Sequence, residues 1–60
     1  MDPNENLRQQ NVLADRINAQ RDRGEHIDEH DAMRLAELVL ALNEWIVGGG
    51  FLPSVWAHVR

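Results

Sequence analysis

The chain has 60 residues, a net charge of −4, no cysteine and no lysine, so all six of its basic residues are arginines. Without cysteine, disulfides and thiolate metal sites are excluded. A domain of this length buries only about 60% of its unfolded surface, so it usually needs a metal or another chain for stability. The acidic balance disfavours direct nucleic-acid binding, which requires a basic face.

The first segment predicts a helix from Pro3 to about Asp22. Asp2 can cap it, Pro3 suits the first helical position, and Glu5 completes the spacing of a capping box. Gly24 is expected to end the helix. Its apolar stripe is thin and is shared with polar side chains. The stripe contains Leu7, Leu13, Ala14 and Ile17, together with Asn6, Gln10 and Gln20.

The second segment predicts a helix from Asp28, a good N-cap residue, to Val47, where glycines 48–50 end it. A helical wheel places apolar residues over about two-thirds of its circumference, which is typical of a helix buried on more than one side. The first helix can cover only one of those sides. One stripe contains Leu35, Leu38, Val39, Leu42, Trp45 and Ile46; an adjoining stripe contains Met33, Ala36, Leu40 and Val47.

The apolar excess of the second helix predicts self-association. Part of its first stripe follows the 3-4-3 spacing of a helix–helix seam. We therefore expect an all-α fold in which residues 1–60 form one domain, a two-helix hairpin (3–22 and 28–47) that pairs into a dimeric four-helix bundle. The predicted self-association seam consists of Leu35, Leu38, Val39, Leu42, Trp45 and Ile46.

Residues 48–50 form a glycine hinge, and residues 51–60 form an apolar tail. Helical spacing and the position of Pro53 predict a short helical turn; a strand with Val55, Ala57 and Val59 on one face is the alternative. Phe51 is expected to fold back on Ile46. Because exposed tryptophans anchor interfaces, the tail is a candidate partner-binding surface. Its residues are Phe51, Leu52, Val55, Trp56 and Val59.

The run from His26 to His30 fits the H-x-x-E-H pattern of a zinc protease. That chemistry needs both histidines on one helical face and a third ligand. If Asp28 caps the second helix, His26 lies outside it and this geometry is lost. Ser54 is the only serine or threonine, and the glycines follow a helix instead of preceding one. We expect no metal, no cofactor and no catalysis.

A nucleic-acid-associated regulator is the main alternative, with arginines on the outside of a dimer; a minor structural component of a virion is another. Within residues 1–23, four acidic residues balance the four arginines. Those arginines are Arg8, Arg16, Arg21 and Arg23.

No N-terminal segment combines basic residues with an apolar run, so we expect no signal peptide. The densest apolar run, residues 35–47, is interrupted by polar residues and is too short to cross a bilayer. We expect a soluble, intracellular protein.

The run DAMRLAELVLALNEWIVGGGFLPSVW, residues 31–56, resembles a segment of small uncharacterised proteins from actinobacterial, mycobacteriophage-like phages. Those proteins carry an LAELVxALxEW helix followed by GGFLPxxW. The matching residues are Leu35, Ala36, Glu37, Leu38, Val39, Ala41, Leu42, Glu44, Trp45, Gly49, Gly50, Phe51, Leu52, Pro53 and Trp56. The resemblance implies a phage origin and a bacterial host cytoplasm, but no mechanism. We therefore expect a non-enzymatic phage accessory protein that binds itself and a host or phage protein.

Overall fold

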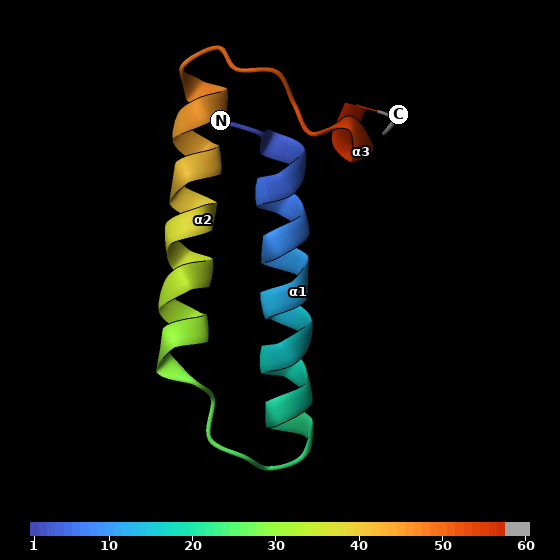
Figure 1. Ribbon diagram of the computed structural model, residues 1–60, viewed down its shortest axis with the longest axis vertical. Helices are drawn as coiled ribbons and strands as arrows, with labels where there is room; N and C mark the ends of the chain where they lie inside the picture. The colour runs from blue at the N-terminus through green and yellow to red at the C-terminus, as the bar shows by residue number, and fades with distance from the viewer. Residues whose placement is uncertain (58–60) are drawn as a thin grey trace.

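The computed structural model describes residues 1–57, which contain the helices α1 (Pro3–Asp22), α2 (Glu29–Val47) and α3 (Ser54–Ala57). The two long helices lie side by side and antiparallel, joined by the loop 23–28 (Figure 1). This confirms the all-α hairpin and the bounds expected for both helices. Within the described part of the tail, Ser54–Ala57 is helical and no strand is present, so the strand alternative is wrong there.

The start of α1 is set by its cap residue. Asp2 has extended backbone angles, and its Oδ1 accepts hydrogen bonds from the backbone N–H groups of Asn4 (3.0 Å) and Glu5 (3.2 Å). Pro3 follows at a position where the missing N–H costs no helical hydrogen bond. The carboxylate of Glu5 accepts from Arg8, one turn further along the helix. The N-cap is therefore confirmed, while the Glu5 side chain is engaged within the helix.

Both long helices end in a glycine with left-handed backbone angles. Gly24 has φ +72°, and the following N–H of Glu25 donates to the carbonyl of Gln20 over 2.9 Å. This is the hydrogen bond of a Schellman motif, which satisfies a carbonyl that the helix leaves free. Gly49 ends α2 in the same way, with φ +95°. A side chain at either position would be strained, so glycine fixes where each helix stops.

The loop and the start of α2 are held by Asp28 and Gln20. The Oδ1 atom of Asp28 accepts from the backbone N–H groups of His30 (2.8 Å) and Asp31 (3.4 Å), as expected for an N-cap. The backbone N–H of Asp28 in turn donates to Oε1 of Gln20 over 3.1 Å. The loop is thereby tied to the last turn of α1, and α2 starts alongside it.

The hairpin core is small and includes one polar bridge. Leu13, Leu38 and Leu42 are buried between the helices. Beside them lies buried Asn6, whose Nδ2 donates to the carbonyl of Leu38 over 3.0 Å, while its Oδ1 accepts from Gln10 over 2.7 Å. A buried amide is costly unless it is hydrogen-bonded. This bridge therefore favours the register in which Asn6 meets Leu38.

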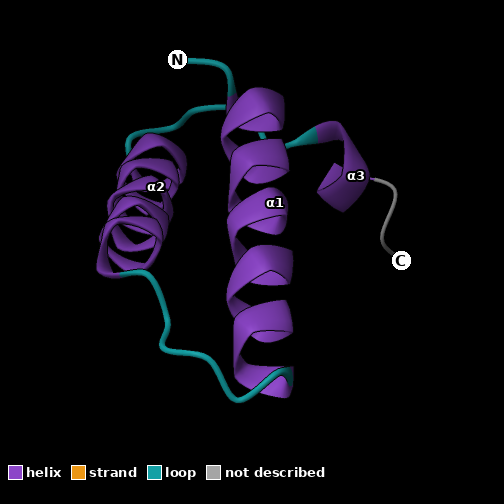
Figure 2. Ribbon diagram, turned by 60° about the horizontal axis from the view of Figure 1, so that its bottom comes forward, coloured by secondary structure: helices purple, strands orange, loops and turns teal. Residues whose placement is uncertain are grey.

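The helix α3 lies beside the N-terminal end of α1, so the tail crosses the end of the hairpin from α2 to α1 after the glycines (Figure 2). Figure 1 shows the same arrangement from a second direction. Of the helices described, none has the length and apolar character needed to cross a membrane.

Candidate protein-interaction surface

The structure divides the predicted self-association seam between the hairpin interior and its surface. Leu38 and Leu42 are 6% and 3% exposed and belong to the core shared with α1. Leu35, Trp45 and Ile46 are half-buried at its margins. Only Val39, which is 47% exposed, faces solvent. While the hairpin is closed, α1 covers the central leucines, so they offer no surface to a second chain.

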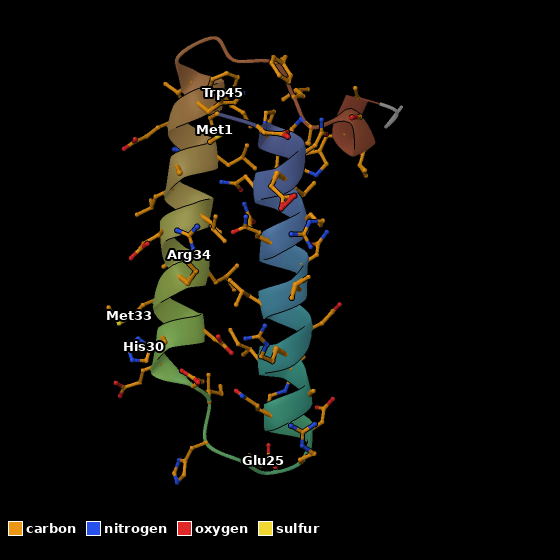
Figure 3. The ribbon with its side chains drawn as sticks, viewed as in Figure 1. Met1, Glu25, His30, Met33, Arg34 and Trp45 are labelled. Atoms are coloured by element: carbon orange, nitrogen blue, oxygen red, sulfur yellow. The ribbon has the colours of Figure 1, made fainter. Side chains whose placement is uncertain are left out.

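The second apolar stripe of α2 is the one that faces solvent. Met33, Leu40 and Val47 are 61%, 63% and 79% exposed, and Ala36 between them is exposed as well. Figure 3 shows the Met33 side chain pointing away from α1. Large apolar side chains gathered along one face of a helix are typical of a surface that binds another protein. We call Met33, Ala36, Leu40 and Val47 the outer stripe.

The tail is attached to the end of α2 by its two aromatic residues. The rings of Trp45 and Phe51 meet edge to face, with centroids 5.5 Å apart and planes at 87°. Nε1 of Trp45 also donates to the carbonyl of Phe51 over 2.9 Å. Phe51 therefore packs on Trp45, and its expected contact with Ile46 stays a prediction. Gly50 permits the contact, because a Cβ atom there would overlap the indole ring.

A second attachment joins the tail to α1. Oδ1 of Asn4 accepts hydrogen bonds from both the backbone N–H (2.6 Å) and the hydroxyl of Ser54 (2.8 Å). Pro53, immediately before, is completely buried. Sequence reasoning missed this contact, since Asn4 and Ser54 are 50 positions apart and neither belongs to a motif.

The anchored tail leaves most of the predicted partner-binding residues in solvent. Phe51, Leu52, Val55 and Trp56 are 63%, 47%, 68% and 40% exposed. The fifth, Val59, lies outside the described residues. Beside Trp56 is a shallow hollow of about 200 Å³ that reaches across α1 and α2. Its lining residues are Gln10, Val39, Leu42, Asn43, Ile46 and Trp56.

The arginines are neutralised locally. Each of the five within residues 1–57 has a carboxylate oxygen within 3.5 Å. The pairs are Arg8–Glu5, Arg16–Asp31, Arg21–Asp22, Arg23–Glu25 and Arg34–Glu37. The hydrogen bond from Arg8 lowers the pKa of Glu5, and that from Arg23 lowers the pKa of Glu25. This part of the chain therefore presents no uncompensated basic face of the kind that phosphate binding requires.

The zinc-like motif is split by the start of α2. His30 lies in the first turn of the helix, whereas His26 lies in the loop before the cap residue Asp28. The two histidines therefore do not share a helical face. Among residues 1–57, no group of three or more potential metal-ligating side chains could hold an ion.

Comparisons with known proteins leave the family open, since no family model, curated protein or solved structure matches this chain.

Proposed function

We propose that this chain is a non-enzymatic accessory protein of a bacteriophage, acting by protein–protein interaction with itself and with a host or phage protein. The observation that carries the proposal is the amount of apolar surface left in solvent. Three large side chains of the outer stripe and four of the tail are each 40–79% exposed. Monomeric soluble proteins rarely expose contiguous apolar patches larger than a few hundred Å² unless the patch binds something.

The dimensions of the hairpin favour its association with an additional chain. Its radius of gyration is 13.1 Å, and it extends 39 × 23 × 15 Å, whereas a compact domain of this length has a radius of about 10 Å. Among residues 1–57, three apolar residues form the buried core, together with the buried Pro3 and Pro53. A second chain would cover the outer stripe and add a second buried apolar layer on the other side of α2. Burial of apolar surface is the main favourable contribution to such association.

The phage origin rests on the resemblance of residues 31–56 to the actinobacterial phage segment. In that setting the protein acts in the cytoplasm of the infected cell. The tail is the surface proposed for a host or phage partner. Its aromatic and aliphatic groups protrude at one end of the hairpin, where Trp45 and Asn4 hold it in place.

Two forms of one experiment test the two interactions. Co-expressed copies carrying different affinity tags should purify together, and failure to do so would contradict self-association.

For the partner, the tagged chain is used to capture proteins from infected cells, alongside a variant carrying Val55→Asp and Trp56→Asp. A protein captured by both chains equally would contradict the tail as its binding surface. The variant should keep the helical circular dichroism of the parent, since both side chains are exposed.

A nucleic-acid-associated regulator is the second candidate, because Arg8, Arg16 and Arg34 line one shallow hollow between α1 and α2. Each of the three is paired with a carboxylate, which weakens this candidate. Titration against duplex DNA at two salt concentrations distinguishes the functions. A regulator must bind with an affinity that falls steeply as salt rises. A virion component, the remaining alternative, would be present in purified particles.

A further inference from the structure

The outer stripe of α2 has the spacing of a coiled-coil seam once Asn43 is included. The seam residues are Met33, Ala36, Leu40, Asn43 and Val47, separated by 3, 4, 3 and 4 positions; we call them the outer seam. This repeat keeps one side of a helix against a partner helix. At about 100° per residue, Leu40 lies about 160° around the helix from each of the buried residues Leu38 and Leu42. The outer seam is therefore centred on the side of α2 opposite α1, with Asn43 at its edge toward the hollow beside Trp56.

We propose that the outer seam binds a second copy of this chain, with the two α2 helices parallel and in register. This inference rests on the proposed self-association and adds its surface and its orientation. The four helices would then form a layer, with the two α2 helices in the middle and an α1 on each outer side. This arrangement leaves the core around Leu38 and Leu42 intact, because each chain keeps its own hairpin.

Asn43 favours the parallel, in-register alignment. In that alignment each seam residue meets its own counterpart, so the two Asn43 amides face each other, and each can donate to the other's carbonyl oxygen. An antiparallel alignment that sets Ala36 against Leu40 sets Asn43 against Met33. The thioether of methionine is only a weak acceptor, so the amide would be left with poor partners. A polar residue in an otherwise apolar seam is a known determinant of register.

The charges beside the seam favour the same orientation. One flank carries Glu37 and Glu44, and the other carries Ala32, Val39 and Ile46. In a parallel pair, opposite flanks meet, so the glutamates lie along the apolar flank of the partner and half-exposed Val39 becomes covered. An antiparallel pair brings equal flanks together and sets glutamate against glutamate, which is destabilising.

The seam is short, so the dimer should dissociate on dilution. From Met33 to Val47 it extends about 21 Å along the helix. An isolated helix of that length is marginal in water. Here packing against α1 already holds α2 in a helix, so the seam side chains are in place before the second chain binds. This preorganisation lowers the entropy cost of association.

The absence of cysteine makes the orientation directly measurable by cross-linking. In the parallel pair, Val47 lies against Val47 of the partner, within disulfide distance. In antiparallel alignments it lies against Glu29 or Ala36, so the two Val47 positions are about 16–27 Å apart. The Val47→Cys variant should therefore form a covalent dimer under mild oxidation, more than about tenfold faster than a Val12→Cys control. Val12 is also exposed, at 43%, but lies on α1.

Leu40→Glu tests the seam without a cross-link. A charge buried in the seam without a partner should raise the dissociation constant of the dimer more than about a hundredfold. Val12→Glu introduces the same charge on α1 and should leave it unchanged. Both variants should keep the parent's helical circular dichroism, because both side chains are exposed in the hairpin.

The outcomes separate this inference from the function it rests on. Fast cross-linking of Val47→Cys with loss of association in Leu40→Glu supports the parallel outer seam. If differently tagged copies purify together but Leu40→Glu associates like the parent, the seam is wrong while self-association stands. If Leu40→Glu dissociates but Val47→Cys cross-links no faster than its control, the parallel orientation is overturned. If tagged copies never purify together, self-association fails and the inference fails with it.

Discussion

Leu42→Ala should destabilise the folded hairpin far more than Leu40→Ala, although the two leucines are two positions apart on one helix. Leu42 is 3% exposed and Leu40 is 63% exposed. Truncating a buried leucine to alanine costs about 2–5 kcal/mol of unfolding free energy. At about 0.05–0.15 kcal/mol per residue, a 60-residue chain has about 3–9 kcal/mol in total. Leu42→Ala therefore removes a large share of the stability and should lower the melting temperature by more than about 8 °C.

The assay is urea unfolding followed by circular dichroism, at a low and a high protein concentration. At low concentration, where the chain is a monomer, Leu40→Ala should cost less than about 0.5 kcal/mol, as is usual for a surface position. At high concentration it should cost more, because the parent gains stability from the second copy and the variant gains less. If the two variants were equally stable at low concentration, the assignment of Leu42 to the core and Leu40 to the surface would be refuted.

Two further predictions concern the tail and an exposed ion pair. Gly50→Ala should displace the indole of Trp45, since the new Cβ overlaps that ring. We expect a shift in tryptophan emission that Gly48→Ala does not produce, and equal spectra would contradict the tail geometry. Glu5 should titrate at a lower pH in the parent than in Arg8→Ala, because Arg8 lowers the pKa of the Glu5 carboxyl. The stability from this pair is present above the unfolded pKa of about 4.3 and is lost as pH falls through the lower folded value. Identical NMR midpoints for Glu5 in the two chains would contradict the pairing.

The helix bounds were predictable because their signals are local. Asp2 and Asp28 cap the helices with side-chain oxygens, and Gly24 ends α1 with a backbone conformation that other residues rarely adopt. Each signal acts within a few residues of its position. The cap at Asp28 is such a local signal, and it also predicted that His26 and His30 do not share a helical face.

The packing of α2 was not predictable from its pattern alone. Both of its apolar stripes have helical spacing, and only the tertiary structure selects which one faces α1. The stripe with Leu38 is selected in the structure, where the Leu38 carbonyl also accepts the Asn6 amide. The outer stripe, which includes Leu40, is thereby left in solvent. Residues that the sequence pattern predicts to contact a second chain can therefore be buried within the hairpin of a single chain.

The tail depends on contacts between residues that no short motif connects. Its helical turn was predictable from Pro53 and the apolar spacing. Its position was not, since it depends on the Asn4–Ser54 hydrogen bonds and on the edge-to-face contact of Phe51 with Trp45. The contact with Trp45 also needs Gly50, whose missing Cβ leaves room for the indole.

The most direct measurement of the central claim is the solution mass of the chain, by light scattering on a sizing column over a wide range of concentrations. The account predicts a mass that rises from one chain toward two as concentration increases, with helical circular dichroism throughout. A mass of one chain at every concentration, from a folded hairpin, would contradict it, because the outer stripe would then remain in solvent without a second copy.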